Sequence, residues 1–170
     1  MKTVACLALL AMIGFGSDGF QRESPRQAKD PLEGKPAPAL QVQNWVGANA
    51  DAMTWDKLRG KVVVLDFWGT WCGPCVAAVP KLKDLQAKYG KDGLVIIGVH
   101  TTSGAEKMAD FAKKESLPYA VAADVQNGTV TAYGVDSYPD YYLIDRKGVL
   151  RFADLANAEL ERAIQHLLKE

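Results

Sequence analysis

Two cysteines separated by two residues follow directly on a strand-like run, and this arrangement constrains the chain more than any other feature. The apolar run covers residues 62–68, is rich in β-branched residues and is typical of a strand buried on both faces. From residue 76 onward, apolar residues recur at spacings of three and four, the period of an amphipathic helix. Cys72 and Cys75 therefore lie where a buried strand gives way to a helix.

This position predicts redox chemistry. In the first turn of a helix, unpaired backbone N–H groups and the positive end of the macrodipole favour an anion. The thiolate of Cys72 is such an anion, so its pKa should be lowered and its nucleophilicity at neutral pH raised. Cys75 lies one turn further along, close enough to attack a mixed disulfide on Cys72.

A zinc site is the alternative explanation of two closely spaced cysteines. Structural zinc needs four Cys or His ligands, usually in two clustered pairs. The remaining candidates are Cys6, His100 and His166, which form no spaced pair. We therefore favour the redox interpretation and expect no metal.

The first 33 residues differ in character from the rest of the chain. Residues 1–16 resemble an export signal, with Lys2 followed by an apolar stretch too short to span a bilayer comfortably. We expect cleavage near Gly16, or retention of the leader as an N-terminal membrane tether. Residues 17–33 are polar and predict a linker, and residues 34–170 have the length of one domain.

Charge and cysteine content narrow the function further. The 170 residues carry 20 basic and 20 acidic side chains, which gives no argument for nucleic-acid binding. Because Cys6 lies in the leader, the mature chain has only the two cysteines of the motif. In an oxidising compartment such a pair serves chemistry rather than a structural framework. We expect no cofactor beyond the Cys72–Cys75 disulfide itself.

Periodicity predicts an α/β domain with a mixed central sheet flanked by helices. An N-terminal hairpin is expected from residues 40–45 and 53–55. Further strands are expected at residues 62–68, 94–99 and 119–122, a C-terminal hairpin at 141–145 and 149–153, and helices at 72–89, 105–114, 125–133 and near the C-terminus.

The segment from Asp66 to Cys75, followed by Pro80, resembles the active-site segment of the thioredoxin superfamily. The wider chain resembles the TlpA/ResA-like thiol–disulfide oxidoreductases. Residues 34–38, 58–61 and 133–148 support this resemblance, which covers about residues 34–170 and implies a thioredoxin-like fold. Relative to a minimal thioredoxin, about 25 residues near 101–125 form a central insertion, as in the TlpA-like branch.

The resemblance implies several substrate-binding residues. Pro139 matches the cis-proline that faces the cysteine motif in the superfamily, and Tyr138 before it would line the substrate groove. Trp71 is expected to be a partly exposed platform beside Cys72. Gly73 and Pro74, the interior of the motif, complete the expected substrate-binding set.

Asp66 and His100 are two further candidate residues because of their positions in the predicted strands. Asp66 lies six residues before Cys72 within the apolar run, so burial should raise its pKa and let it accept the Cys75 proton. The alternative is an ordinary solvated acid at a strand end. His100 ends the next strand, and we expect it to face solvent without a catalytic or metal-binding role.

The leading hypothesis is a protein thiol–disulfide oxidoreductase in the periplasm or on the outer face of a bacterial cytoplasmic membrane. Cys72 attacks the substrate disulfide and Cys75 resolves the mixed disulfide. The Gly-Pro interior resembles reducing members, which implies protein disulfide substrates, a membrane thiol-relay reductant and a monomer. Ala78 stands where cytochrome-maturation members often carry Glu, which argues against that client.

Two alternatives belong to other classes. A peroxiredoxin-like peroxidase would carry Thr two residues before its reactive cysteine with a proline upstream. Thr70 is two residues before Cys72, but the nearest preceding proline is Pro38, far outside the active-site segment, so the full arrangement is missing. Non-enzymatic Cu(I) binding suits a thiolate pair, but copper-delivery relatives use a longer cysteine spacing and a dedicated histidine, which His100 does not obviously supply.

Overall fold

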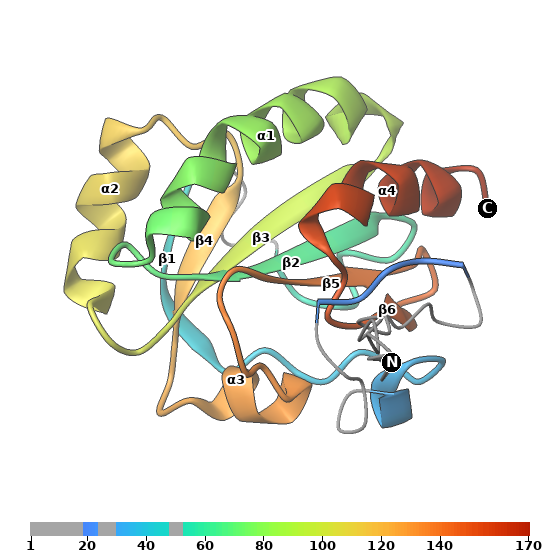
Figure 1. Cartoon of the computed structure of the whole chain (residues 1–170), viewed down its shortest axis with the longest axis horizontal. Coiled ribbons are helices and arrows are strands. Elements are labelled where there is room, and N and C mark those ends of the chain that lie inside the picture. The colour runs from blue at the N-terminus through green and yellow to red at the C-terminus, as the bar shows by residue number, and fades with distance from the viewer. Residues whose placement is uncertain (1–18, 24–29, 48–52) are drawn as a thin grey trace, which may run out of the picture.

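The computed structural model describes residues 19–23, 30–47 and 53–170, and these residues form a six-stranded mixed sheet with helices on both faces (Figure 1). The strand order is β1-β4-β3-β2-β5-β6. The strands are β1 Val42–Val46, β2 Val62–Trp68, β3 Leu94–His100, β4 Ala120–Asp124, β5 Asp140–Ile144 and β6 Leu150–Phe152. The helices are α1 Gly73–Tyr89, α2 Met108–Lys114, α3 Gly128–Tyr133 and α4 Leu160–Leu168, with short 3-10 segments η1 Asp30–Leu32, η3 Gly90–Asp92, η4 Ala105–Lys107 and η5 Asn157–Glu159. The predicted α/β class with a mixed central sheet is confirmed.

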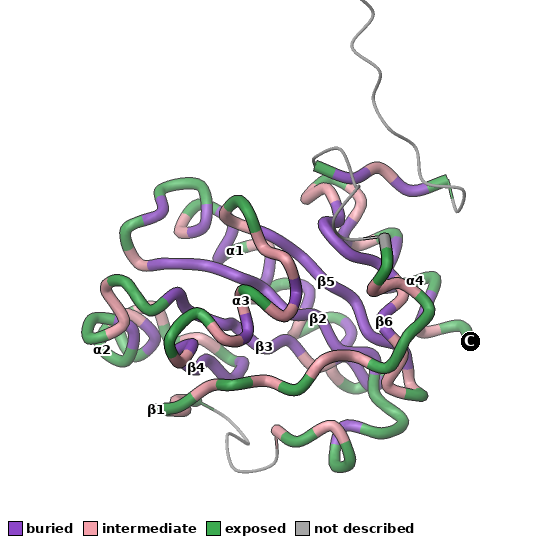
Figure 2. The backbone as a smooth tube through the Cα atoms, turned by 90° about the horizontal axis from the view of Figure 1, so that it is seen from below, coloured by how far each residue is buried: buried purple, intermediate pink, exposed green. Residues whose placement is uncertain are grey.

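β2 is the central strand, and all of its residues are buried. It pairs in parallel with β3 and antiparallel with β5. Because side chains alternate along a strand, Val62, Val64 and Trp68 pack in the cluster that holds α1, α2 and α4. The odd-numbered residues of β2 pack on the opposite face with α3. Figure 2 shows most of the sheet as a buried layer, whereas the edge strand β1 is more exposed. Asp66, an even-numbered residue, therefore lies on the α1 side of the sheet.

The prediction of an N-terminal hairpin is wrong. β1 pairs antiparallel with β4, from Val42↔Asp124 to Val46↔Val121, and residues 53–55 form no strand. Residues 48–52, which include part of the predicted turn, lie outside the described residues. β4 would otherwise leave an open sheet edge, and an edge strand readily accepts another extended segment. Trp55 is held instead by its indole N–H, which donates to the carbonyl oxygen of Pro38 at 2.9 Å.

The expected insertion at residues 101–125 forms regular structure. It contains η4 and α2, then returns as β4, which pairs in parallel with β3 from Ile97↔Ala120 to His100↔Ala123. The insertion therefore widens the sheet by a strand and places a helix beside the carboxyl end of β3.

Part of the expected polar linker packs on the domain. Phe20 is buried, and its ring centroid lies 4.7 Å from that of Phe152. Arg22 forms a β-bridge with Leu155 and an ion pair of 3.0 Å with Glu33. The described residues of this segment are therefore anchored along the chain that follows β6.

The predicted leader at residues 1–16 lies outside the described residues. Residues 17–18 and 24–29 of the predicted linker also lie outside them. Within residues 19–23, 30–47 and 53–170, no helix has both the length and the apolar character needed to cross a bilayer.

Candidate active site

The two cysteines lie at the start of α1, directly after the carboxyl end of β2. Cys72 is the N-cap residue, with an extended backbone (φ −85°, ψ 103°). A disulfide joins it to Cys75, and the two Cα atoms are 5.3 Å apart. The backbone N–H of Cys75 donates to Sγ of Cys72 at 3.2 Å. After reduction, this N–H and the helix terminus would stabilise a thiolate on Cys72.

Only the interior of the motif is open to solvent. Cys72 and Cys75 are 5% and 3% exposed, whereas Gly73 and Pro74 are exposed. A Cβ atom built on Gly73 would meet no other atom within 4 Å. The exposed residues Gly73 and Pro74 therefore lie between the two buried cysteines, and their substrate-binding role stays a prediction.

Asp66 is buried beneath this helix. Its side chain is on the α1 face of β2, the residue is 5% exposed, and its Oδ1 atom has no hydrogen-bond partner among the described residues. Burial, with a smaller contribution from the nearby charge of Asp140, raises the pKa of Asp66 from 3.8 to about 7. The expected burial and pKa shift are thus present, and the carboxyl group can change its protonation state near neutral pH.

Two buried tyrosines share the electrostatic environment of Asp66. Burial raises the pKa of both Tyr119 and Tyr141, and the negative charge of Asp66 raises each further. The hydroxyl group of Tyr141 has no hydrogen-bond partner in the described part of the chain. Both phenols stay protonated near neutral pH, so the carboxyl group titrates in this region while the phenols do not.

The predicted substrate groove brings two aromatic residues together. The Tyr138–Pro139 peptide bond is cis, as the resemblance implies. Extending the β2–β5 register by one residue beyond Phe67↔Asp140 places Pro139 level with Trp68, just before the motif. The ring of Tyr138 packs edge-on to that of Trp71, with centroids 5.8 Å apart.

Trp71 is a fixed, exposed platform. Trp71 is 57% exposed. Its indole N–H nevertheless donates to the carbonyl oxygen of Ser103 at 3.0 Å. A Cβ atom at Gly69 would lie 2.8 Å from Nε1 of this indole, and one at Gly104 would lie 3.2 Å from its Cδ1 atom. The absence of side chains at both glycines therefore leaves room for the ring.

His100 does not face solvent, and the prediction that it does is wrong. The residue is fully buried, and its ring packs edge-on to Trp68 with centroids 4.8 Å apart. Nε2 accepts a hydrogen bond from the backbone N–H of Thr70 at 2.9 Å, and Nδ1 lies 2.7 Å from the carbonyl oxygen of Thr101. Burial lowers the pKa of His100. Phe111 of α2, which lies in the insertion, packs against the same indole, with its ring centroid 5.3 Å from that of Trp68.

Metal-binding residues do not gather at this site. Among the residues that the structure describes, no group of three or more His, Cys, Asp or Glu side chains could hold a metal ion. His100 is engaged with backbone groups on both ring nitrogens and does not supply the dedicated ligand of a copper site.

The comparisons with known proteins agree with this geometry. The AhpC/TSA family model matches residues 34–153. The thiol-disulfide oxidoreductase ResA of Geobacillus thermodenitrificans is 32% identical over 168 residues, which are 98% of this chain and 92% of that protein. The thiol:disulfide interchange protein HelX of Rhodobacter capsulatus is 31% identical over 151 residues, 86% of this chain and 83% of that protein. A thiol-disulfide isomerase structure from Corynebacterium glutamicum superposes with a TM-score of 0.67 at 28% identity, over 79% of this chain and 97% of that one.

A thioredoxin-like fold with a dithiol at a helix N-terminus defines a protein thiol–disulfide oxidoreductase. The chain belongs to the AhpC/TSA family, and within it to the ResA-like thiol–disulfide oxidoreductases.

Sequence reasoning missed the residues that hold the turn before Cys72, namely Thr70, His100 and Ser103. A usable signal was present. β2 and β3 are adjacent parallel strands whose carboxyl ends meet at the same edge, and the register Trp68↔His100 follows from aligning those ends. A polar residue at the end of β3 is thus placed next to the turn that leads into the motif.

Proposed function

We propose that this oxidoreductase is an exported reductase of disulfides in other proteins. The observation that carries the proposal is the placement of the Cys72–Cys75 disulfide at the N-terminus of α1, above the buried carboxyl group of Asp66. This arrangement supplies a stabilised attacking thiolate, a second thiol one turn away and a group that can accept a proton. The dithiol is itself the redox group, so the proposed reaction uses no bound cofactor and no metal.

The reaction begins with reduced Cys72. Its thiolate attacks one sulfur of the substrate disulfide, forms a mixed disulfide and releases the other substrate sulfur as a thiolate, which takes up a proton. Cys75 then loses its proton and attacks Sγ of Cys72. This step closes the Cys72–Cys75 disulfide and releases the second substrate thiol. The substrate gains two electrons and two protons, and the enzyme dithiol is oxidised.

Asp66 serves the second step in this proposal. Its carboxylate accepts the Cys75 proton as that thiol becomes a nucleophile. A pKa of about 7 suits a group that gains and loses a proton near neutral pH. Its position on the α1 face of β2 supports this assignment, because Cys75 is in the first turn of that helix.

Substrate binding is assigned to the surface around the motif. Trp71 and Tyr138 provide an aromatic wall, and Gly73, Pro74 and Pro139 contribute backbone beside the disulfide. An extended segment that carries the substrate cysteine would lie between them. Such a surface suits a polypeptide substrate and carries no feature for nucleic acid.

The proposed location is the periplasm or the outer face of a bacterial cytoplasmic membrane. Two observations support it: the signal-like residues 1–16, which act as a cleaved leader or as a tether, and a mature chain whose only cysteines form the motif. A reductase in an oxidising compartment needs a supply of electrons, and a membrane thiol-relay protein is the proposed donor. We propose that the enzyme acts as a monomer.

The decisive test measures the direction and class of the reaction. The reduced protein should reduce a fluorogenic disulfide peptide, and equilibration with glutathione should give a potential nearer about −270 mV than the roughly −120 mV of a strong oxidant. Consumption of hydrogen peroxide at a comparable rate would favour the peroxidase alternative. Stoichiometric, tight Cu(I) binding without peptide reduction would favour the copper alternative. A potential near the oxidant value would refute the reductase assignment.

A further inference from the structure

The segment that follows β3 contacts the turn that leads into the cysteine motif. The backbone N–H of Thr70 donates to Nε2 of His100 at 2.9 Å. The adjacent N–H of Thr101 donates to the carbonyl oxygen of Trp68 at 2.9 Å. The two segments are therefore joined by two hydrogen bonds: residues 68–70 donate one to residue 100, and residue 101 donates the other to residue 68.

The hydrogen bonds of His100 define its protonation state. Nδ1 lies 2.7 Å from the carbonyl oxygen of Thr101, a group that can only accept, so Nδ1 carries the proton. Nε2 must then be unprotonated, since it accepts from the N–H of Thr70. Both ring nitrogens are thus satisfied in one neutral tautomer. Burial lowers the pKa of His100 and favours this neutral form, against smaller opposing effects of the hydrogen bond to Thr101 and of the charge of Glu106.

The turn held in this way ends at the attacking cysteine. The backbone N–H of Cys72 donates to the carbonyl oxygen of Gly69 at 3.0 Å. This hydrogen bond closes a turn that contains Thr70. A shift of Thr70 away from His100 would therefore move the N-cap residue relative to the first turn of α1. The stabilisation of a thiolate by a helix N-terminus falls off within the first turn, so the position of Cys72 is coupled to its reactivity.

We infer that His100 is a positioning residue for Cys72: its Nε2 lone pair holds the backbone of Thr70, and thereby keeps the Cys72 sulfur at the N-terminus of α1. This inference rests on the proposed role of Cys72 as the attacking thiol. The hydrogen bonds described for His100 go to Thr70 and Thr101, so in this inference it acts through the turn.

Two matched substitutions separate the two hydrogen bonds. In His100→Gln the amide oxygen can occupy the position of Nε2 and accept from Thr70. In His100→Asn the shorter amide reaches only the position of Nδ1 and keeps the contact with Thr101. The control is Thr70→Val, which retains the backbone N–H but removes the hydroxyl group that lies 3.3 Å from Nε2.

The measurement is the rate at which iodoacetamide alkylates Cys72 in the reduced protein at pH 7, located by mass spectrometry, together with the glutathione equilibrium constant. His100→Asn should slow alkylation about three- to tenfold, the range that one hydrogen bond is worth, and should change the equilibrium constant. His100→Gln and Thr70→Val should stay within about twofold of the wild type. Equal losses in the Asn and Gln variants, or no loss in the Asn variant, would overturn the inference.

A measurement on the unmodified protein guards against variants that fold poorly. The ¹⁵N spectrum of the His100 ring should show a protonated Nδ1 and an unprotonated Nε2, and the opposite tautomer would overturn the inference. Failure of the wild type to reduce the disulfide peptide would refute the proposed function instead. The alkylation comparison does not depend on turnover, so the two failures are distinguishable.

Discussion

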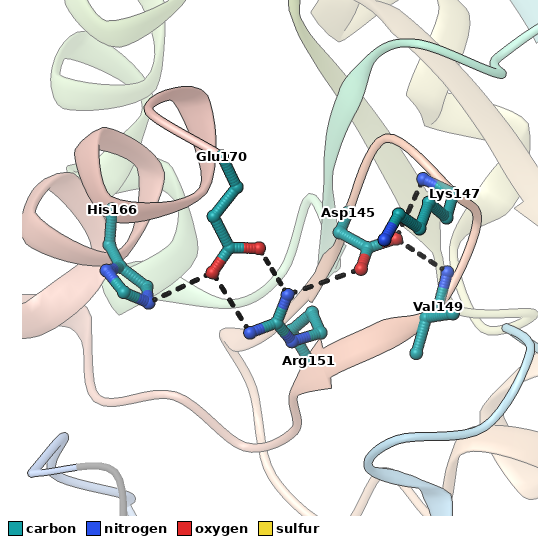
Figure 3. Close-up of polar contacts among 6 residues, drawn as sticks. All are labelled: Asp145, Lys147, Val149, Arg151, His166 and Glu170. Atoms are coloured by element: carbon teal, nitrogen blue, oxygen red, sulfur yellow. Dashed lines mark hydrogen bonds and ion pairs between the residues drawn. The ribbon is translucent and has the colours of Figure 1, made fainter.

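Buried carboxyl groups occur at both ends of the β2–β5 pair, Asp66 beneath the cysteines and Asp145 in the turn that joins β5 to β6, and their surroundings differ. Asp145 accepts hydrogen bonds from the backbone N–H groups of Lys147 at 2.9 Å and Val149 at 3.0 Å (Figure 3). Its other oxygen pairs with Arg151 at 3.3 Å. The carboxyl group of Asp145 is therefore bonded through both oxygens.

The same network continues to the end of the chain. Arg151 binds both carboxylate oxygens of Glu170, and Nε2 of His166 lies 3.4 Å from Glu170 (Figure 3). Near the cysteines the reverse holds, because Oδ1 of Asp66 and Nε1 of Trp68 are buried without a hydrogen-bond partner among the described residues.

The difference separates polar groups that stabilise the fold from those that cost stability. A buried group with its partners contributes to folding, whereas one without partners carries a desolvation cost. Such costs are tolerated at sites where activity needs them. We therefore interpret the end that holds Asp66 as the chemical end of the molecule and the end that holds Asp145 as structural.

Loss of either cysteine should have the largest effect, and only at the chemical end. Cys72→Ser should abolish peptide reduction and form no adduct, because no attacking thiol remains. Cys75→Ser should accumulate mixed disulfides, because the adduct on Cys72 cannot be resolved. Non-reducing electrophoresis and mass spectrometry after mixing with a disulfide-containing protein would measure both. Equal trapping by the two variants would contradict the assigned order of attack.

Asp66→Asn tests whether the unpartnered carboxyl group serves the second step. Formation of the Cys72 adduct should be nearly unchanged, whereas its resolution should slow by roughly ten- to a thousandfold, because general-base assistance is lost. Stopped-flow fluorescence can separate the steps, with Trp68 and Trp71 as reporters. If the first step slows and the second does not, Asp66 tunes Cys72 instead.

The same variant should change the pH dependence of stability. The pKa of Asp66 is raised from 3.8 to about 7, so the folded state holds this proton more tightly than the unfolded state. Stability therefore falls as pH rises from about 4 to about 7, by up to roughly 4 kcal/mol. Asp66→Asn should abolish this decrease and be more stable than the wild type at pH 8, with little difference at pH 4. Urea denaturation at both pH values would measure this, and equal shifts at the two would refute it.

Asp145→Ala should do the opposite at the structural end. It leaves the N–H groups of Lys147 and Val149 without their acceptor and Arg151 without one of its partners, so unfolding should become easier by about 1–3 kcal/mol. The alkylation rate of Cys72 should stay within about twofold of the wild type. Asp145→Asn, which keeps an oxygen acceptor, is the matched control and should lose less. A changed redox potential in Asp145→Ala would break the separation between the two ends.

Glu170→Gln should have the smallest effect. Glu170 and Arg151 pair at the surface, where such pairs contribute about 0–1 kcal/mol. The variant should lower Tm slightly at low ionic strength, and the difference should shrink in about 1 M salt because the charges are screened. A large loss that persists in high salt would show that this pair is a main determinant of the fold.

Local patterns predicted the chemical end well. Cys72, Cys75 and Asp66 belong to one strand–helix unit, so the alternation of β2 and the start of the helix were enough to place them. Asp145 drew no attention in the sequence, because its partners are backbone groups of the turn and an arginine from the next strand.

The remaining features of the fold and the site depend on contacts between residues far apart in the sequence, and local patterns could not predict them. His100 ends an apolar run, and nothing nearby in the sequence shows that its ring packs against Trp68, which Phe111 of α2 also contacts. The pairing of β1 with β4 joins segments about 80 residues apart, while the hairpin inferred from residues 40–55 was the nearest pairing available. Gly98 likewise has no local signal, yet a Cβ atom there would lie 2.8 Å from Nε1 of Trp68.

The packed residues Phe20 and Arg22 determine from which side the domain is held. Figure 1 shows this segment beside β6 and α4, whereas α1 begins at the opposite end of the sheet, next to α2. Anything attached ahead of residue 19 therefore joins the molecule at the end remote from Cys72. If the leader is kept as the proposed tether, the attachment is therefore on the side of the domain opposite the dithiol.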